Sequence, residues 1–252
     1  MLAAFIIPFP VARIDNVLQT VRLLEINHPE IVKVSEIILM CQDRCGKIDT
    51  KFPHYQLHNM KCPYMEKCKL VNKGVECVSP HTENLVFLDS DRVLPPGYFN
   101  DVLNNLKEGT AVTTKRLLRL TKPFSDQDIL DGKYTYEEEN RSLDNKALMR
   151  NLFAGNCTMK KKDFLKAGGM DEDYVGYGFE DHDMTNRIIQ AGIEAVWRDE
   201  VELHLYHERL TYGSGDQKKM FLDNGLRYCR KWNLPIPGKL QHEINEYTKR
   251  MI

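Results

Sequence analysis

The sequence lacks a hydrophobic run long enough to cross a membrane. A transmembrane helix needs about 20 apolar residues, whereas the longest apolar run, residues 2–9, already contains Pro8. This run also has no basic leader and no small-residue cleavage site, so it predicts a first β-strand rather than a secretory signal. We therefore expect a chain that has no transmembrane segment and that stays in the cytoplasm.

Neither sign of charge is in excess. The chain has 35 Lys and Arg against 36 Asp and Glu, for a formal net charge of -1. Nucleic acids and anionic membranes attract an excess of positive charge, so we expect no nucleic-acid partner, and local groups must hold any anionic ligand. The 252 residues include 42% hydrophobic ones and show neither an internal repeat nor an interdomain linker, which predicts one globular domain over residues 1–252.

Cysteines in CxxC spacing are also missing. The seven cysteines are an odd number in a chain without an export signal, which favours free thiols over a disulfide framework. The pairs Cys41/Cys45 and Cys62/Cys68 leave a zinc site open as the less favoured alternative, because their spacing is not that of structural zinc ligands.

The hydrophobic pattern predicts an α/β protein. Apolar runs that read as strands alternate with segments of helical period over the first hundred residues, which favours a doubly wound sheet with ligands beyond the carboxyl ends of its strands. The strands are expected at 2–9, 36–41, 55–60, 84–88 and 111–120, and the helices between them at 14–24 and 65–78. Further along we expect an excursion without regular structure at 122–150, helices at 161–167, 180–190 and 216–232, and strands at 194–198 and 201–206.

Two carboxylates follow the fourth expected strand. Asp89 and Asp91 stand at alternate positions just past residues 84–88. Hard oxygen ligands at such a strand end suit Mg²⁺ or Mn²⁺ bridging a diphosphate. The alternative is a pair of turn or helix-capping acids ahead of Pro95-Pro96.

A second acidic run combines glycine and aromatic residues over positions 168–183. Glycines let backbone approach a ligand closely, and carboxylates at the start of the expected helix at 180 are stabilised by its dipole. A solvated helix cap would account for Glu180 and Asp183, but not for the whole run. We favour a ligand site here.

Two histidines follow the last expected strand. Side chains alternate along a strand, so His204 and His207 should point to opposite faces and only one should face the site. An imidazole is a good third ligand for Mn²⁺ beside carboxylates. We prefer His207, because it lies where the strand ends, and keep His204 as the alternative.

These motifs resemble those of nucleotide-sugar-dependent glycosyltransferases of the GT-A fold, in the β-1,4-galactosyltransferase and chondroitin-polymerase branch. Residues 69–74, Lys-Leu-Val-Asn-Lys-Gly, precede the Asp-Ser-Asp at 89–91 as in the family's Lys-Leu-x-Asn-x-Gly helix and DxD motif. Residues 177–181, Tyr-Gly-Phe-Glu-Asp, are similar to its Trp/Tyr-Gly-x-Glu-Asp motif, with Phe179 where galactosyltransferases usually have Gly. The opening residues 6–9, followed by Arg13, are similar to its nucleotide-contacting turn, although the spacing differs.

The resemblance implies a fold with two functional halves, and an activity. It implies a GT-A type doubly wound sheet, mixed and flanked by helices, in which a Rossmann-like nucleotide-sugar half at about 1–120 is fused to a catalytic and acceptor half at about 121–252. The implied activity is metal-dependent transfer of a sugar from a nucleotide sugar, with UDP favoured, to a glycan or other hydroxyl acceptor, with inversion.

The resemblance also implies roles for individual residues. Asp181 corresponds to the family's proposed catalytic base, and Glu180 to the contact with sugar hydroxyls. Mn²⁺, or Mg²⁺, would be held by Asp91 and His207, with Asp89 reaching the metal or the ribose. The remaining expected nucleotide-sugar contacts are Pro8, Phe9, Arg13, Asn72, Tyr177 and Gly178.

Other assignments stay open at the level of the sequence. Asp43 is a nucleotide-base contact or a turn cap, and Asn156 is a donor-sugar contact or a turn residue. Tyr177 offers a face on which a sugar ring can pack. The segment at 122–150 is the expected acceptor-binding region, because long loops on such scaffolds tend to carry specificity, and residues 211–217 are expected to close over bound donor.

Three other functions compete with this interpretation. A retaining glycosyltransferase of the same fold is the nearest, although the intact Glu-Asp pair favours inversion. A nucleotidyltransferase would open with a glycine-rich basic loop, which residues 8–12 do not form. A non-catalytic glycan-binding module would tolerate loss of the acids, but this sequence keeps them.

Overall fold

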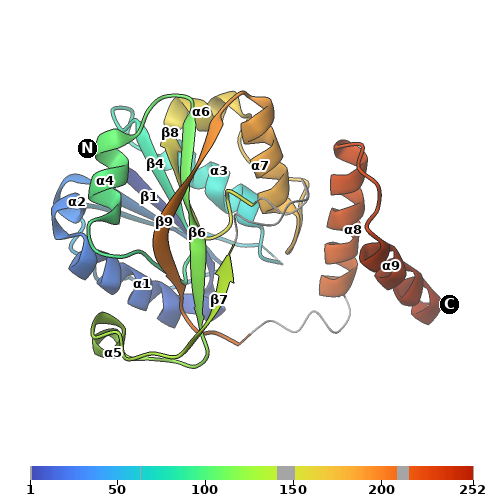
Figure 1. The fold of residues 1–252 in the computed structure, drawn as a ribbon, viewed down its shortest axis with the longest axis horizontal. Helices are drawn as coiled ribbons and strands as arrows, with labels where there is room; N and C mark the ends of the chain where they lie inside the picture. The colour runs from blue at the N-terminus through green and yellow to red at the C-terminus, as the bar shows by residue number, and fades with distance from the viewer. Residues whose placement is uncertain (1, 63, 141–150, 209–215, 252) are drawn as a thin grey trace.

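The chain folds around one mixed β-sheet (Figure 1). The computed structural model describes residues 2–62, 64–140, 151–208 and 216–251. Within them the strands run in the order β3-β2-β1-β4-β8-β6-β9-β5, and β7 pairs with β6 at the side. Their bounds are β1 Ala4–Pro10, β2 Glu36–Gln42, β3 His54–Met60, β4 Asn84–Leu88, β5 Arg92–Val93, β6 Thr110–Leu120, β7 Tyr136–Asn140, β8 Asn156–Lys160 and β9 Glu194–His204.

The first four long strands form the parallel part of the sheet. β1 pairs in parallel with both β2 and β4, and β2 pairs in parallel with β3. β8 then lies antiparallel between β4 and β6, and β6 pairs in parallel with β9. The carboxyl ends of β1, β2 and β4 therefore open on the same edge, as the alternating sequence pattern predicts.

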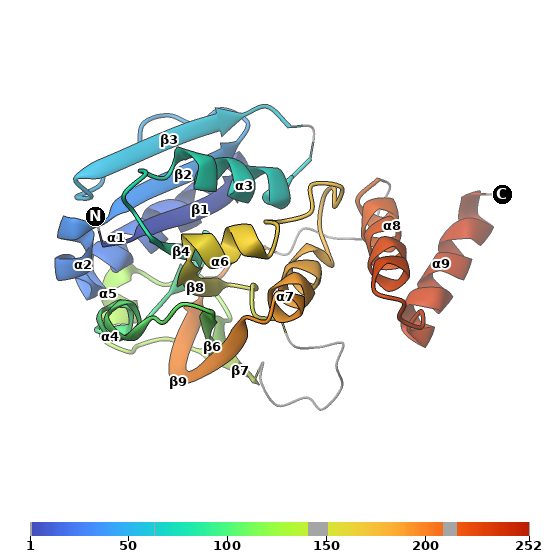
Figure 2. The same cartoon turned by 90° about the horizontal axis from the view of Figure 1, so that it is seen from above.

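Helices cover both faces of the sheet, and Figure 2 shows the two layers from above. One face carries α1 (Ile14–Asn27), α2 (Pro29–Val34) and α4 (Tyr98–Asn105), with the short 3₁₀ turn Val11–Arg13 leading into α1. The other carries α3 (Lys67–Cys77), α6 (Lys161–Lys166) and α7 (Glu180–Gln190). α8 (Asp216–Lys231) lies beside α7, α9 (Gly238–Met251) lies on the far side of α8, and α5 (Asp126–Leu130) lies near the end of β6.

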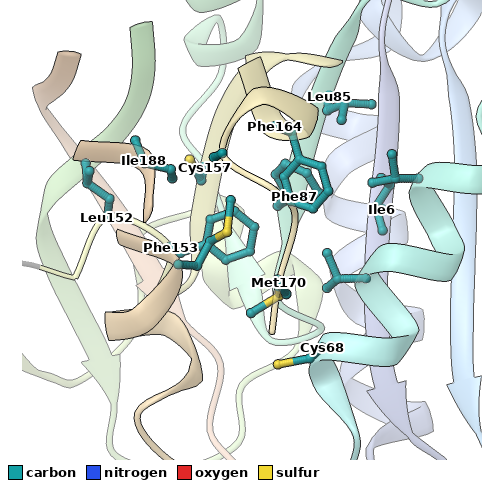
Figure 3. Packing of buried hydrophobic residues seen from close by; sticks show 14 of the residues in the cluster. Ile6, Cys68, Leu85, Phe87, Leu152, Phe153, Cys157, Phe164, Met170 and Ile188 are labelled. Carbon is teal, nitrogen blue, oxygen red and sulfur yellow. The ribbon is translucent and has the colours of Figure 1, made fainter. Parts of the chain in front are cut away.

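The central strands are buried on both faces. Along β1, Ile6 packs under α3 while Phe5 and Ile7 pack under α1 and α4, so a continuous apolar run is what this position requires. Figure 3 shows the layer between the sheet and α3, in which the ring centroids of Phe87 and Phe164 are 4.9 Å apart. Burial of such aromatic and aliphatic side chains is the main force that holds the helices on the sheet.

Two sequence expectations about regular structure were wrong. The segment expected to lack it contains α5 and β7 in its described part, and β7 pairs antiparallel with β6. The two strands expected at 194–198 and 201–206 are the single strand β9. Asp199 and Glu200 interrupt the apolar pattern of β9. These two residues lie opposite the single residue Lys115 of β6, so they form a β-bulge and the strand continues beyond them.

Two further observations concern the whole described chain. All seven cysteines are free, which confirms the expectation from their number and spacing. Within the described residues, no helix combines the length and the apolar character that a membrane span requires.

Candidate active site

A carboxylate and two imidazoles converge at the carboxyl end of β4. Asp91 lies two residues beyond the start of the turn that follows β4, and its Oδ2 is 3.3 Å from His204 Nε2 and 3.1 Å from His207 Nε2. The two Nε2 atoms are 3.0 Å apart. The Arg13 guanidinium also reaches this carboxylate, at 3.6 Å. Asp91 and both candidate histidines thus lie together, as expected for metal ligands, whereas Asp89 does not join them.

Both histidines face the same carboxylate, whereas strand alternation predicts that only one does. β9 ends at His204, so His207 lies outside the strand and the alternation rule does not reach it. Burial lowers the pKa of His204, with help from the neighbouring Arg92 guanidinium. This favours the neutral ring, which is the form that binds a metal.

The spacing of these three groups fits a divalent cation. Their ligand atoms lie within 4.8 Å of one another. Adjacent ligands of an octahedral ion with bonds of about 2.1 Å are about 3 Å apart, close to the three separations given above. One carboxylate oxygen and two imidazole nitrogens also form a donor set that suits Mn²⁺.

Asp89 lies outside this group, although it was expected at the metal or the ribose. Its Oδ1 is 2.8 Å from Lys67 Nζ, and its Oδ2 accepts a hydrogen bond of 3.1 Å from the Gly155 backbone N–H. Both carboxylate oxygens therefore already have protein partners.

Lys67 joins the DxD motif to the Glu-Asp pair. Its Nζ is 2.8 Å from Asp89 and 2.9 Å from Asp181 Oδ1, which links the first residue of α3 with the first turn of α7. Burial alone would lower the pKa of Lys67, but Asp181 and Asp89 outweigh it and raise that pKa well above its usual value. The ammonium therefore stays charged between them.

The two acids of the Glu-Asp pair lie at the start of α7, where Glu180 is buried and Asp181 is half-buried. Burial raises the pKa of Asp181, and Lys67 opposes this effect without cancelling it. Burial and the neighbouring Asp181 raise the pKa of Glu180 to about 7. The Oε2 atom of Glu180 is buried without a hydrogen-bond partner. Raised pKa values at adjacent carboxyl groups are typical of sites that move protons.

Lys67 was not among the residues expected at the site. It stands two positions before the Lys-Leu-x-Asn-x-Gly motif, within the helix predicted from the sequence at 65–78. The signal that was available is a lysine at the first turn of a helix, where its charge opposes the helix dipole unless acidic groups lie nearby.

The two asparagines expected to contact the donor are occupied elsewhere. Asn72 donates to the Met170 carbonyl at 2.9 Å and accepts from the Met170 N–H at 3.0 Å, which ties α3 to the loop before α7. Asn156 is fully buried in β8, where its amide accepts from the Tyr98 hydroxyl at 3.1 Å and donates to Glu202. Both side chains thus satisfy buried polar groups of the fold.

The expected nucleotide-base contacts lie at the ends of β1 and β2. Pro8 and Phe9 are buried, and the Phe9 ring belongs to the core beneath α1. Asp43 is exposed directly after β2, with a φ of 73° and its N–H bound to the Met60 carbonyl at 2.8 Å. Asp43 therefore stays available to a ligand at this edge, whereas the Phe9 side chain does not.

The loop before α7 packs against α8. Tyr177 is 56% exposed, while Gly178 has a φ of 107° and a Cβ added to it would lie 2.5 Å from the Phe221 ring. Phe179 has a φ of 68°, and its ring centroid is 5.3 Å from that of Phe221 and 5.6 Å from that of Tyr228. The phenylalanine at the position that is usually glycine thus faces α8. The expected closing segment at 211–217 lies mostly outside the described residues.

Comparison with known proteins points to one group of enzymes. Residues 137–209 match the family described as the N-terminal domain of galactosyltransferase. Mouse chondroitin sulfate synthase 3 is 25% identical over 141 residues, which are 53% of this chain but only 15% of the mouse protein. The resemblance to GT-A glycosyltransferases of this branch is confirmed.

Solved structures of GT-A glycosyltransferases share the fold. A mutant of Drosophila β-1,4-galactosyltransferase 7 in complex with manganese, UDP-Gal and xylobiose has a TM-score of 0.55 at 17% identity, covering 86% of this chain and 78% of that one. GalNAc-T7 with UDP, GalNAc and Mn²⁺ has a TM-score of 0.58 at 11% identity, covering 90% and 47%. The fold class expected from the sequence, a GT-A type sheet, is therefore correct.

Proposed function

We propose that this chain is a metal-dependent, inverting glycosyltransferase that moves a sugar from a UDP-sugar to a hydroxyl of a glycan. The observation that carries the proposal is that a cation-binding group, Asp91 with His204 and His207, and the acid pair of α7 meet at one edge of the sheet, where Lys67 bridges Asp181 and Asp89, two residues before Asp91. The similar structures that contain UDP, a sugar and manganese support UDP and Mn²⁺ as donor nucleotide and metal, with Mg²⁺ as the alternative.

The metal site suits the leaving diphosphate, and the acid pair suits the attacking hydroxyl. Mn²⁺ bound to Asp91 and the two imidazoles would act as a Lewis acid that neutralises the charge of the departing diphosphate. Asp181 is the proposed base, because Lys67 keeps its carboxylate ionised while burial makes it more basic. Glu180 beside it would accept a hydrogen bond from a sugar hydroxyl. Proton removal by Asp181 from the attacking hydroxyl fits inversion in a single displacement.

The acceptor side is proposed to include β7. A cavity of about 250 Å³ lies beside the imidazoles, and Glu137 of β7 lines it together with Tyr206, His207 and Glu208. Glu137 belongs to the segment at 122–150 that we expected to bind the acceptor. We keep the proposed division between a nucleotide-sugar half at about 1–120 and a catalytic and acceptor half at about 121–252.

Calorimetric titration with a panel of UDP-, GDP- and dTDP-sugars tests the donor, with Mn²⁺ and then with EDTA, while UDP release is followed in the same samples. One UDP-sugar should bind only with Mn²⁺ present and release UDP slowly. Failure of every sugar nucleotide to bind with metal would contradict the proposal and favour a non-catalytic glycan-binding module.

The Asp181→Asn variant tests the base. Turnover should fall at least about 10²-fold, the scale of general base catalysis, while UDP binding with Mn²⁺ stays close to that of the wild type. Asp173→Asn is the matched control, since Asp173 lies in the same acidic run but forms an ion pair with Arg227 on α8. A variant at Asp181 that keeps most of the activity would place the base elsewhere.

A further inference from the structure

A buried arginine lies directly behind the proposed metal ligand. Arg92 follows Asp91 in the chain, opens β5 and is 8% exposed. Its Nε is 3.0 Å from Asp91 Oδ1, and its Nη1 is 3.4 Å from Glu202 Oε1. The guanidinium thus lies within ion-pair distance of the carboxylate at the metal site and of a carboxylate in β9, and these contacts lack hydrogen-bond geometry.

The two oxygens of Asp91 have different partners. Oδ1 meets Arg92, whereas Oδ2 meets His204 and His207. We propose that Arg92 is a positioning residue that fixes Asp91 so that only Oδ2 is presented to the divalent cation. The inference rests on the proposed function, since it takes the group of Asp91 with two histidines as the cation site.

Glu202 anchors the arginine in the sheet. It is completely buried and accepts hydrogen bonds from Thr114 Oγ1, at 2.7 Å, and from the Asn156 amide. This gives Asn156 a place in the site different from the one that the sequence suggested. The metal ligand is thereby connected through Arg92 and Glu202 to β6, β8 and β9.

The backbone register reinforces the same arrangement. β5 and β9 are antiparallel, and Arg92 is paired with His204 in that ladder. One residue pair therefore fixes a histidine ligand and the arginine that orients the carboxylate ligand. Outer-shell partners of this kind set the direction in which a metal ligand points.

Positioning and simple charge predict opposite effects of removing Arg92. A cation next to a metal ligand repels the metal, so loss of its charge alone would tighten Mn²⁺ binding. Loss of positioning instead leaves Asp91 free to turn away from the histidines and weakens Mn²⁺ binding. The sign of the change in affinity therefore distinguishes the two.

The experiment measures Mn²⁺ affinity by electron paramagnetic resonance of free Mn²⁺, with and without UDP, together with the melting temperature of each variant. Arg92→Met should weaken Mn²⁺ binding about 10- to 100-fold, the range found for outer-shell partners. Arg92→Lys should recover only part of this loss, because an ammonium does not bridge two carboxylates as a guanidinium does. Arg198→Met is the control, since Arg198 lies on β9 but pairs with Asp101 and Glu200.

Two variants keep the test decisive if Arg92→Met does not fold. Arg92→Met with Glu202→Gln also removes the buried negative charge that loses its arginine, and it should bind Mn²⁺ about 10- to 100-fold more weakly than the wild type. Glu202→Gln alone loosens the anchor and should weaken binding at least about threefold. Wild-type affinity in both variants, or tighter binding in Arg92→Met, would overturn the inference. A wild-type protein that binds no Mn²⁺ would instead contradict the proposed function.

Discussion

Replacing Glu180 by Gln should stabilise the protein several times more at pH 8 than at pH 5. Glu180 is 6% exposed, and burial together with Asp181 raises its pKa from 4.5 to about 7. The folded protein therefore binds this proton more tightly than the unfolded chain does, so the free energy of unfolding falls as the pH rises from about 4.5 to about 7. Above pH 7 the wild type carries the whole cost of the buried charge, which glutamine does not.

The size of this stabilisation follows from the shift in the pKa of Glu180. At about 1.4 kcal/mol per pKa unit, the shift corresponds to about 3 kcal/mol. A domain of this length changes its melting temperature by about 2 °C per kcal/mol, which gives an increase of about 6 °C at pH 8. Glutamine has nearly the shape of glutamate and keeps an oxygen for the backbone N–H groups that the carboxylate accepts from.

Thermal unfolding at pH 5 and pH 8, in EDTA and without nucleotide, measures the difference. Glu194→Gln is the matched control, because Glu194 is exposed at the start of β9, and it should shift the melting temperature little at either pH. If Glu180→Gln raised the melting temperature equally at both pH values, or lowered it at pH 8, the description of Glu180 as an acid with a raised pKa would be refuted.

Three further substitutions test the geometry of the metal site and of the loop before α7. His204→Ala and His207→Ala should each weaken Mn²⁺-dependent UDP binding at least about tenfold in calorimetry, because both rings contact Asp91. His81→Ala is the control, since His81 is exposed. If only one of the two variants bound UDP more weakly, the other ring would not be a metal ligand. Gly178→Ala should lower the melting temperature by about 2–6 °C, since its φ of 107° and its approach to Phe221 both oppose a Cβ. A melting temperature equal to that of Gly46→Ala, where a Cβ would meet nothing within 4 Å, would contradict that expectation.

Sequence periodicity predicts most of the fold because burial of the central strands is nearly complete. β1, β2 and β4 are apolar at almost every position, and the α7 helix was expected with the bounds that it has. The pattern fails where pairing rather than burial forms the strand. β7 has the sequence Tyr-Glu-Glu-Glu-Asn, without apolar alternation, and is held by its ladder to β6 and by ion pairs such as that of Arg116 with Glu138.

The sequence predicted which residues form the candidate site, but not which way each side chain points. The sequence pointed to Asp91, His207 and Asp181 and left His204 as an alternative, and the structure brings the first two together with His204. It could not show that Asn72 and Asn156 satisfy the fold, since an amide side chain binds a backbone group or a ligand equally well. It also did not reveal Lys67 or Arg92, because their partners Asp181 and Glu202 lie more than a hundred positions away in the chain.

That distance in sequence has a consequence for how the protein acquires its site. The ion pair of Lys67 with Asp181, and the approach of His204 to Asp91, each join residues more than a hundred positions apart. Contacts of such high sequence separation close large loops and form late in folding. Pairing of β1 to β4 alone would therefore leave Lys67 without Asp181 and Asp91 without the two imidazoles, which join the site only when α7 and β9 pack on the rest of the sheet.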